Sequence, residues 1–334
     1  MKVFPTILLV LLLCVSSWAN AQNADGGNDK LKVAVVRTPY SGLPAIWHDH
    51  NYGLELSQGP AILEREGLVD VLERLGCQVE TAGVRLTPEE EQEFGVRFRL
   101  GLANHHLKEL VAGFVEKGYF PIGLQANDPS ALGMLAGLQQ SGPGRRPLKV
   151  GVVWIDAHAD FNTPETSRSG MLGGMPVAIA AGLCLKRLRL QSGLEPALPT
   201  RYIVLGGVQD IDPLEQELLD RSKIEILSTD DIKHHSDNVH HQMKRLSGLT
   251  DAIYVHIDLV DIVDDKEHPE VEMTFPDGPT SDELAVTLET IFRYRKARAL
   301  GIASYPAGQD NDKMFLKAAY RLVEGTIKGV KSRD

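Results

Sequence analysis

The stretch KVGVVWIDAHAD, residues 149–160, decides how this chain folds and where its chemistry lies. Its first part, Lys149 to Ile155, is an apolar run rich in β-branched residues, which is typical of a buried strand. Asp156, His158 and Asp160 follow at alternate positions, separated by alanines. Alternate side chains of an extended backbone point the same way, so we expect these three to converge. They suit a divalent cation such as Mn²⁺. The alternative is that Asp156 caps the next turn and the others are solvated.

Similar apolar runs recur along the chain, and segments with helical periodicity separate them. We predict strands at 31–36, 79–81, 120–124, 149–155, 202–205, 224–227, 253–258 and 299–303. We predict helices at 60–75, 89–117, 130–139, 176–185, 213–220, 230–246, 281–295 and 313–328. Strands that alternate with helices form a parallel sheet with helices on both faces. The sequence therefore predicts an α/β fold in a single domain over residues 31–331, with ligands beyond the carboxyl ends of the strands.

A second acidic group follows the predicted strand at 253–258. This strand ends at Asp258, with Asp261, Asp264 and Asp265 just behind it. A carboxylate from another strand end is what a metal cluster needs, and acidic groups gathered without a cation would repel one another. The alternative is a solvated acidic loop, and for Asp264 and Asp265 we favour that interpretation.

These motifs give the chain a resemblance to the ureohydrolases, which include arginase, agmatinase and formimidoylglutamase. DAHADFNTP, residues 156–164, resembles the Asp-Ala-His-x-Asp signature of this family and the Asn-Thr-Pro that follows it in arginases. VQDIDPLE, residues 208–215, is similar to the arginase segment that supplies acidic groups to the amino end of the substrate. The resemblance covers the chain from the predicted first strand onward. It implies a three-layer α/β/α fold with a mainly parallel eight-stranded sheet, and a hydroxide, activated by Mn²⁺, that attacks a guanidino or amidino carbon.

The resemblance also implies a set of metal ligands, with two departures. Where the family has a histidine ligand, a gap-free comparison places Asp128, so one position is expected from Asp128, Asp156, Asp160 and Asp258. The second position requires Asp156, His158, Asp258 and a carboxylate two residues after Asp258, where Val260 stands. Asp261 can replace it if the loop bulges by one residue. We expect one or two Mn²⁺ ions per chain.

The substrate end keeps more of the family pattern than the catalytic end. The resemblance implies substrate contacts from Asn162, Ser167, Ser169, Asp212 and Glu215. Met171, Gly173 and Ser304 stand where arginases carry an asparagine, a proton-shuttling histidine and the carboxylate that holds the guanidinium group. His158 and Asp160 are the candidate catalytic residues, and Asp160 is placed to orient the hydroxide. We therefore expect a hydrolase of an arginine-like guanidino or amidino compound. The alternative is a catalytically impaired member that binds a metal or a ligand.

Other histidines allow both functional and structural interpretations. His48 and His50 follow the first predicted strand and either reach the cluster or are polar loop residues. His234, His235, His240 and His241 fall on one predicted helix, with His234 and His241 on one face. His256 is expected to be a buried structural residue or a partner of Asp258. The chain lacks a P-loop, a complete dinucleotide fingerprint and a Gly-x-Ser-x-Gly elbow.

Composition and termini indicate the compartment and the partners. The 334 residues include 35 Lys and Arg against 45 Asp and Glu, so a nucleic-acid partner is not expected. Residues 1–21 have the pattern of a signal peptide, 22–30 that of a flexible N-terminus, and no later run is long enough to span a membrane. We predict a secreted or periplasmic protein. Cys77 and Cys184 are expected to be separate buried thiols, and the family resemblance implies a homo-oligomer.

Overall fold

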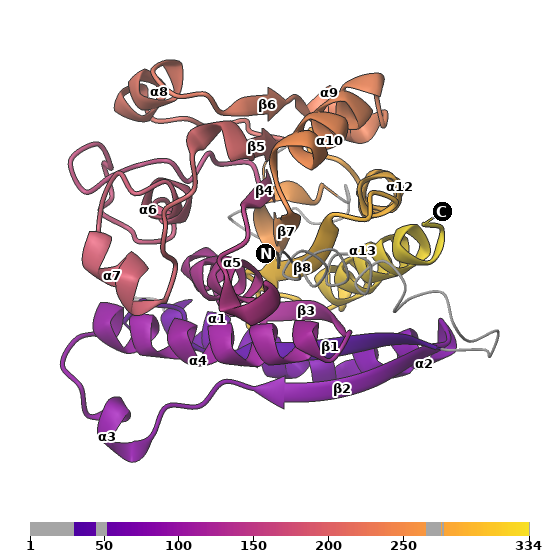
Figure 1. The fold of residues 1–334 in the computed structure, drawn as a ribbon, viewed down its shortest axis with the longest axis horizontal. Helices are drawn as coiled ribbons and strands as arrows, with labels where there is room; N and C mark the ends of the chain where they lie inside the picture. The colour runs from indigo at the N-terminus through magenta and orange to yellow at the C-terminus, as the bar shows by residue number, and fades with distance from the viewer. Residues whose placement is uncertain (1–29, 45–51, 265–274, 276, 334) are drawn as a thin grey trace, which may run out of the picture. The chain divides into compact units, whose positions relative to one another are not determined.

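A parallel sheet of eight strands organises the described part of the chain. The computed structural model describes residues 30–44, 52–264, 275 and 277–333. The strands are β1 (Leu31–Thr38), β2 (Cys77–Gly83), β3 (Phe120–Gln125), β4 (Val150–Ile155), β5 (Ile203–Gly206), β6 (Glu225–Leu227), β7 (Ala252–Asp258) and β8 (Ala297–Ala303). Their order is β2-β1-β3-β8-β7-β4-β5-β6, and every pairing is parallel. All eight predicted strands are present, and the predicted fold class is confirmed (Figure 1).

Helices cover both faces of this sheet, which makes three layers. The helices are α1 (Tyr52–Leu63), α2 (Val69–Arg74), α3 (Pro88–Glu91), α4 (Val96–Glu116), α5 (Ala131–Gln140), α6 (Pro176–Ala180), α7 (Lys186–Gln191), α8 (Pro213–Asp220), α9 (Thr229–Lys233), α10 (Asp237–Leu249), α11 (Leu259–Ile262), α12 (Ser281–Phe292) and α13 (Met314–Lys331). Buried residues of α1, α2, α9, α10, α12 and α13 pack on one face, and those of α4, α5, α6 and α7 on the other.

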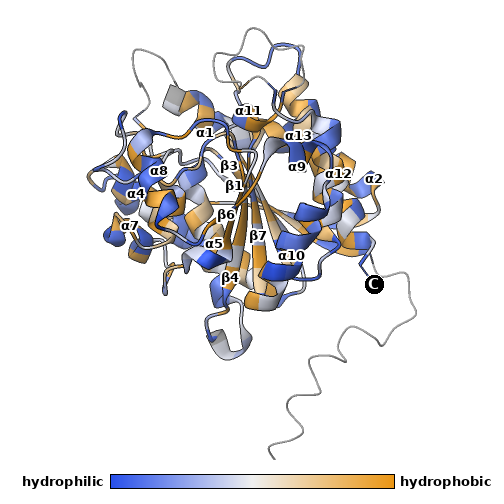
Figure 2. Cartoon of the chain, turned by 90° about the horizontal axis from the view of Figure 1, so that it is seen from above, coloured by the Kyte–Doolittle hydropathy of each residue, from blue (hydrophilic) through white to orange (hydrophobic). Residues whose placement is uncertain are grey.

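The central strands alternate their side chains between two hydrophobic cores. In β4, Val153 and Ile155 belong to the core beneath α12 and α13, whereas Val152 and Trp154 belong to the core beneath α4 and α5. Figure 2 shows the strands as an apolar layer between helices whose outer surfaces are more polar. A strand that is buried on both faces has a continuous run of apolar residues. This run allowed the strand to be predicted from the sequence.

Some predicted helices begin, end or break elsewhere. The helix predicted at 89–117 is interrupted because Gly95 has a φ of 91°, so α3 and α4 are separate. The helix predicted at 60–75 begins earlier, at Tyr52, and widens into a π-helical turn at Glu64–Leu68. The helix predicted at 176–185 ends at Ala180, and α7 and α11 were not predicted.

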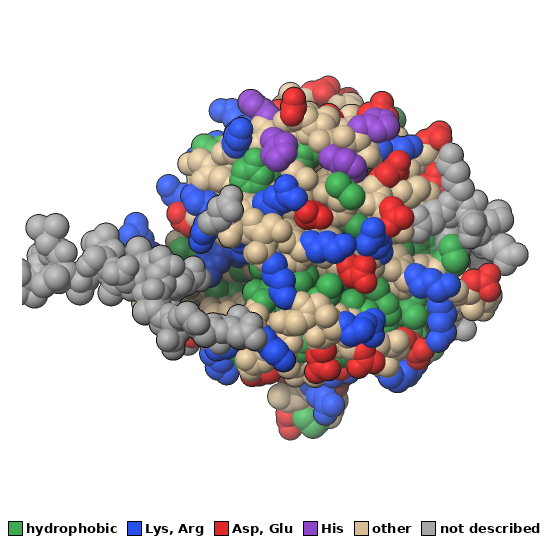
Figure 3. Space-filling model, turned by 90° about the vertical axis from the view of Figure 1, so that its right-hand side faces the viewer, with side chains coloured by type: hydrophobic (Ala, Val, Ile, Leu, Met, Phe, Trp, Pro, Cys, Tyr) green, Lys and Arg blue, Asp and Glu red, His purple; other side chains and the backbone are tan. Residues whose placement is uncertain are grey.

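The predicted histidine face of the helix at 230–246 is wrong. His235 has a φ of 49°, and the chain breaks there into α9 and α10. His234 and His241 therefore do not share one helix. Figure 3 shows histidine side chains gathered on the face of the molecule that carries α9 and α10. Within the described residues they form no group of three with metal-ligand spacing.

Two further features bear on the expectations from sequence. Cys77 and Cys184 are both free, as predicted, but only Cys77 is buried, while Cys184 is half-buried. Among the described residues, no helix is both long enough and apolar enough to span a membrane. His48, His50 and residues 1–21 lie outside the described residues.

Candidate metal and substrate site

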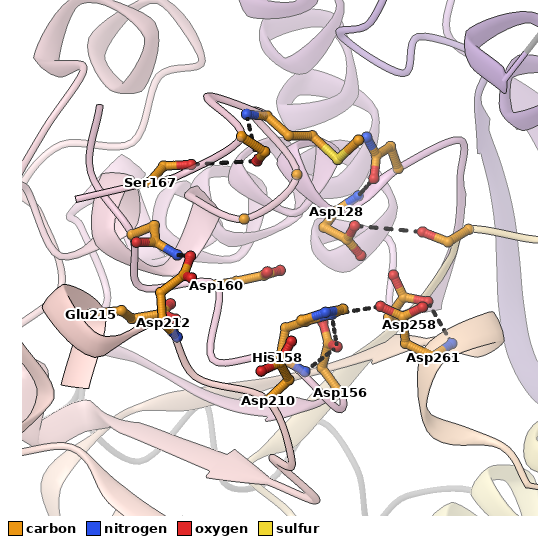
Figure 4. Close-up of a pocket in the computed structure, with 17 residues that line it drawn as sticks. Asp128, Asp156, His158, Asp160, Ser167, Asp210, Asp212, Glu215, Asp258 and Asp261 are labelled. Carbon is orange, nitrogen blue, oxygen red and sulfur yellow. Dashed lines mark hydrogen bonds and ion pairs between the residues drawn. The ribbon is translucent and has the colours of Figure 1, made fainter. Parts of the chain in front are cut away.

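A cavity of about 200 Å³ opens beyond the carboxyl ends of neighbouring strands. Asp128 follows β3, Ser304 follows β8, Asp258 ends β7, Asp156 follows β4, and Asp210 follows β5. These strands are consecutive in the sheet, so their ends meet at one edge. The described lining residues are Asn127, Asp128, Asp156, His158, Asp160, Asn162, Ser167, Ser169, Met171, Gly173, Gly174, Asp210, Asp212, Glu215, Asp258, Asp261 and Ser304. Every residue predicted for the site lines this cavity (Figure 4).

The chain leaves β4 through a bend that presents Asp156. The indole Nε1 of Trp154 donates to Asp156 Oδ2 (3.1 Å), and the backbone N–H of His158 donates to Asp156 Oδ1 (2.8 Å). Asp160 has a φ of 50°, so the backbone turns away from an extended path at this residue. The three predicted side chains therefore reach the same cavity from a bend, and not from a straight continuation of the strand.

Asp261 enters the cavity on a turn of helix. Asp258 caps α11, because its Oδ1 accepts from the backbone N–H groups of Val260 (3.2 Å) and Asp261 (3.3 Å). A residue three positions later in a helix returns to the same face, so Asp261 comes back to the cavity. Val260 is 2% exposed and packs in the core. The expected one-residue bulge is wrong, because a helical turn places the carboxylate.

Two side chains contact the Asp128 carboxylate: His256, which does not line the cavity, and Ser304, which does. His256 Nε2 lies 3.0 Å from Asp128 Oδ1, and the Ser304 hydroxyl donates to Asp128 Oδ2 (3.4 Å). The side chain of His256 is completely buried. Of the two interpretations offered for His256, the buried residue is confirmed, whereas its ring contacts Asp128 and not Asp258.

Two groups of three potential ligands share Asp156. The carboxylate triad is Asp128, Asp156 and Asp160, and the histidine triad is Asp156, His158 and Asp261. In each triad, the potential ligand atoms lie within 4.8 Å of one another. Asp258 lines the cavity but belongs to neither triad. His158 Nδ1 lies 2.7 Å from Asp261 Oδ2 and 3.6 Å from Asp156 Oδ1.

The donor set fits divalent cations. Asp160 Oδ2 and Asp261 Oδ1, one from each triad, are buried and have no hydrogen-bond partner among the described residues. A buried carboxylate oxygen without a partner is costly, and a bound cation removes that cost. Carboxylate oxygens with one imidazole nitrogen match the ligands that Mn²⁺ and similar ions accept.

Crowding of buried charges sets the pKa values in the cavity. Burial raises the pKa of Asp160 and of Asp258 well above the ordinary range of a carboxyl, and the charge of Asp128 adds to both shifts. Burial also raises the pKa of Asp261, to about 6, although His158 opposes this shift. Burial lowers the pKa of His158, but its contacts with Asp156 and Asp261 outweigh this and raise it to about 12. The cavity therefore holds protons in the absence of another cation.

The wall near α8 carries the predicted substrate contacts. Asn162 Nδ2 donates to Asp212 Oδ2 (3.2 Å), and Glu215 accepts from the backbone N–H groups of Phe161 (2.7 Å) and Asp212 (3.2 Å). Ser167 is half-buried and Ser169 is exposed at the rim, with their hydroxyl oxygens 3.5 Å apart. Lys and Arg are absent from the described lining, so this wall attracts positively charged groups.

Sequence reasoning missed several residues of the cavity. Asp210 lies two residues before Asp212 and lines the cavity. Its backbone forms an isolated parallel β-bridge with the backbone of His158. The alternating spacing of Asp210 and Asp212 could have identified it. Asn127 accepts from the backbone N–H of Asp128 (2.9 Å) and begins the turn that positions this carboxylate. No pattern in the sequence indicated Asn127.

Comparisons with known proteins are consistent with this site. The sequence profile of the Arginase family matches residues 65–327. The chain belongs to the arginase family. It is 28% identical over 259 residues to an arginase of Bacillus caldovelox, which covers 75% of this chain and 84% of that protein. It is 32% identical over 211 residues to human Arginase-2, mitochondrial, which covers 60% of this chain and 58% of the human protein.

Solved structures of other family members share the fold. The crystal structure of arginase from Bacillus subtilis superposes with a TM-score of 0.75 and 22% identity, and covers 89% of this chain and 98% of that chain. Formimidoylglutamase from Bacillus subtilis superposes with a TM-score of 0.68 and 16% identity, and covers 92% of this chain and 89% of that one. The predicted relationship to arginase-like ureohydrolases is therefore confirmed at the level of the family.

Proposed function

We propose that this chain is a Mn²⁺-dependent hydrolase that cleaves a C–N bond in the guanidino or amidino group of an arginine-like small molecule. The observation that carries the proposal is the pair of triads sharing Asp156 at the base of one cavity. When bound there, Mn²⁺ would acidify a water molecule and so supply hydroxide as the nucleophile at neutral pH. Asp128, Asp156 and Asp160 would hold one ion, and Asp156, His158 and Asp261 the other, with Asp258 beside both.

The residues of the cavity divide the remaining work. Asp160 has a buried oxygen that no described residue hydrogen-bonds, and this oxygen can accept a proton of the attacking water and orient it. His158 contributes Nδ1, the ring atom directed toward Asp156 and Asp261. Asp212, Glu215 and Asn162 would bind the amino end of the substrate, and the hydroxyl groups of Ser167 and Ser169 would contact its outer polar groups.

Location and assembly complete the proposal. The pattern of residues 1–21 supports export to a secreted or periplasmic location. The family resemblance supports a homo-oligomer, and the net charge of −10 argues against nucleic acid as a partner.

The first experiment measures bound metal. The protein is loaded with Mn²⁺ and desalted, and its metal content is measured by elemental analysis. About two ions per chain are expected, and about one would mean that a single triad binds. Asp156→Asn should lose metal because both triads share this residue. Asp210→Asn changes a carboxylate of the same cavity that lies outside both triads, and should retain metal. An unaltered chain that binds no ion would refute the metal-dependent function.

A second function has its own supporting observation. Met171, Gly173 and Ser304 line the cavity where the family resemblance places catalytic groups, and Ser304 already donates to Asp128. These residues favour a catalytically impaired member that binds a metal or a ligand. The metal-loaded protein should be assayed with arginine, agmatine and formiminoglutamate for the release of urea or the corresponding product. Turnover that Asp156→Asn abolishes and Asp210→Asn retains would exclude this second function.

A further inference from the structure

A buried row of polar side chains that do not line the cavity leads to Asp128. The Tyr254 hydroxyl donates to Gln125 Oε1 (2.9 Å) and lies 3.0 Å from His256 Nδ1. The other ring nitrogen, Nε2, lies 3.0 Å from Asp128 Oδ1. Gln125, Tyr254, His256 and Asp128 are each 5% exposed or less. Buried polar rows of this kind fix the orientation of their members when each contact is made.

The ring of His256 is fixed from two directions. It stacks on the indole of Trp154, with centroids 3.7 Å apart and planes inclined by 20°. Trp154 and His256 are register partners in neighbouring strands, so the sheet itself holds the stack. The Tyr254 hydroxyl then prevents the ring from rotating within its plane. In this orientation Nε2 faces Asp128 Oδ1, 3.0 Å away.

The row crosses β8, the strand between β3 and β7, at a glycine. This glycine, Gly301, is the register partner of His256. A Cβ atom at Gly301 would collide with the Tyr254 hydroxyl and come within 2.5 Å of Gln125 Oε1. A residue without a side chain at position 301 is therefore required for the row to cross β8. This observation is independent of Asp128 and of any metal.

We propose that His256 is a positioning residue that holds the Asp128 carboxylate in the orientation of a metal ligand. The inference rests on the proposed metal-dependent function. With Oδ1 held by His256 and Oδ2 by Ser304, the carboxylate plane is fixed, and its free lone pairs are left for the cavity. At metal sites a ligating histidine is usually oriented by a carboxylate, a backbone carbonyl or a water behind it. Here the order is reversed, because the histidine stands behind a ligating carboxylate.

His256→Phe tests the positioning role. Phenylalanine keeps the stack on Trp154 but lacks the ring nitrogen that contacts Asp128. Loss of a partner behind a ligand weakens metal binding by roughly 10–100-fold. We expect this loss at the carboxylate triad alone, so that Mn²⁺ titrated into the metal-free variant shows one unchanged and one weakened binding step. His256→Gln, whose amide nitrogen lies close to the position of the imidazole Nε2, should restore most of the affinity.

Two further variants separate positioning from general stability. Tyr254→Phe removes the hydroxyl next to Nδ1 and should weaken the same step by a smaller factor, so it also tests the row if His256→Phe does not fold. His240→Phe is the matched control. His240 lies on α10, outside the cavity, and its Nδ1 also contacts a tyrosine hydroxyl, that of Tyr294, at 3.0 Å. This variant should leave both binding steps unchanged. A crystal structure of the metal-free His256→Phe variant should show the Asp128 carboxylate in a new orientation.

The outcomes distinguish this inference from the proposed function. An unaltered chain that binds no Mn²⁺ overturns both. If the folded His256→Phe variant binds Mn²⁺ in two steps with the same affinities as the unaltered chain, the positioning role is overturned and the proposed function stands. A loss of affinity that His256→Gln fails to restore, or that His240→Phe reproduces, also overturns the positioning role, because it would reflect packing alone.

Discussion

The two triads differ in ligand chemistry and in how they meet the solvent. The carboxylate triad contains only oxygen ligands, and Asp128, Asp156 and Asp160 are all buried. The histidine triad contains an imidazole, and the side chain of His158 is 37% exposed. Asp160 is fixed by the turn after β4, whereas Asp261 is carried by the short helix α11. Asp156 belongs to both triads, so one aspartate would serve two candidate metal sites that differ in ligand type and in exposure to solvent.

Removal of the shared residue should have the largest effect. Asp156→Asn deprives both triads of a carboxylate and leaves the indole of Trp154 without its charged acceptor. We expect activity to fall by more than about 100-fold, since even residues behind a ligand contribute 10–100-fold. Steady-state turnover measured beside bound Mn²⁺ checks this. Retention of both ions and of activity would show that the two sites do not share this residue.

The second prediction separates the triads from each other. Asp160→Asn should remove the ion of the carboxylate triad, and Asp261→Asn that of the histidine triad, each leaving about one ion per chain. Asp160→Asn should lower kcat more, because Asp160 is also proposed to orient the attacking water. Elemental analysis and kcat of both variants provide the test. If both variants lost both ions, the triads would be a single site.

The third prediction concerns the pH dependence of stability without metal. Asp261 has a pKa of about 6 in the folded chain against 3.8 normally, and His158 about 12 against 6.5. Both groups bind protons more tightly in the folded than in the unfolded chain, so stability falls as pH rises, from 3.8 to 6 for Asp261 and from 6.5 to 12 for His158. The metal-free protein should therefore melt at a lower temperature at about pH 8 than at about pH 5.

Bound Mn²⁺ should reverse or remove this trend, because cations then replace the protons. Calorimetry at both pH values, with and without Mn²⁺, measures the effect. Asp261→Asn provides the control, since it should flatten the part of the profile below about pH 6. A metal-free protein that becomes more stable toward pH 8 would contradict the charge crowding described for the cavity.

The smallest expected effect lies at the substrate wall. Asp212→Asn keeps a residue suited to the start of α8, so stability should change little. The loss of charge should raise the KM for substrates with an amino group by about 10-fold, equal to about 1.4 kcal/mol, and leave kcat unchanged. Kinetics with a substrate that lacks the amino group supply the control. An equal change with both substrates would mean that Asp212 does not bind the amine.

The sequence predicted the strands and the cavity better than it predicted local geometry. The runs that became β3, β4 and β7 are buried on both faces, so their apolar composition was unambiguous. Asp128, Asp156 and Asp258 lie at or within three residues of those strand ends, and all three line the cavity.

Local geometry depended on contacts that no short pattern encodes. Asp261 reaches the cavity because Asp258 caps a helical turn, whereas a bulge was expected. His256 turns toward Asp128 because Trp154 and Tyr254 fix its ring. The break between α9 and α10 results from the backbone at His235, whose φ of 49° is uncommon for a residue other than glycine.

Trp154 has a further consequence for the study of this protein. Its indole donates to Asp156, which both triads share, and stacks on His256, which contacts Asp128 of the carboxylate triad. Beyond residues 1–21, the chain contains only one other tryptophan, Trp47. Indole emission responds to the charge and polarity of its surroundings, and the binding of a paramagnetic ion nearby quenches it. If the triads bind Mn²⁺ as proposed, this indole is an intrinsic optical reporter, through which the order and speed of metal loading can be followed in real time without a label.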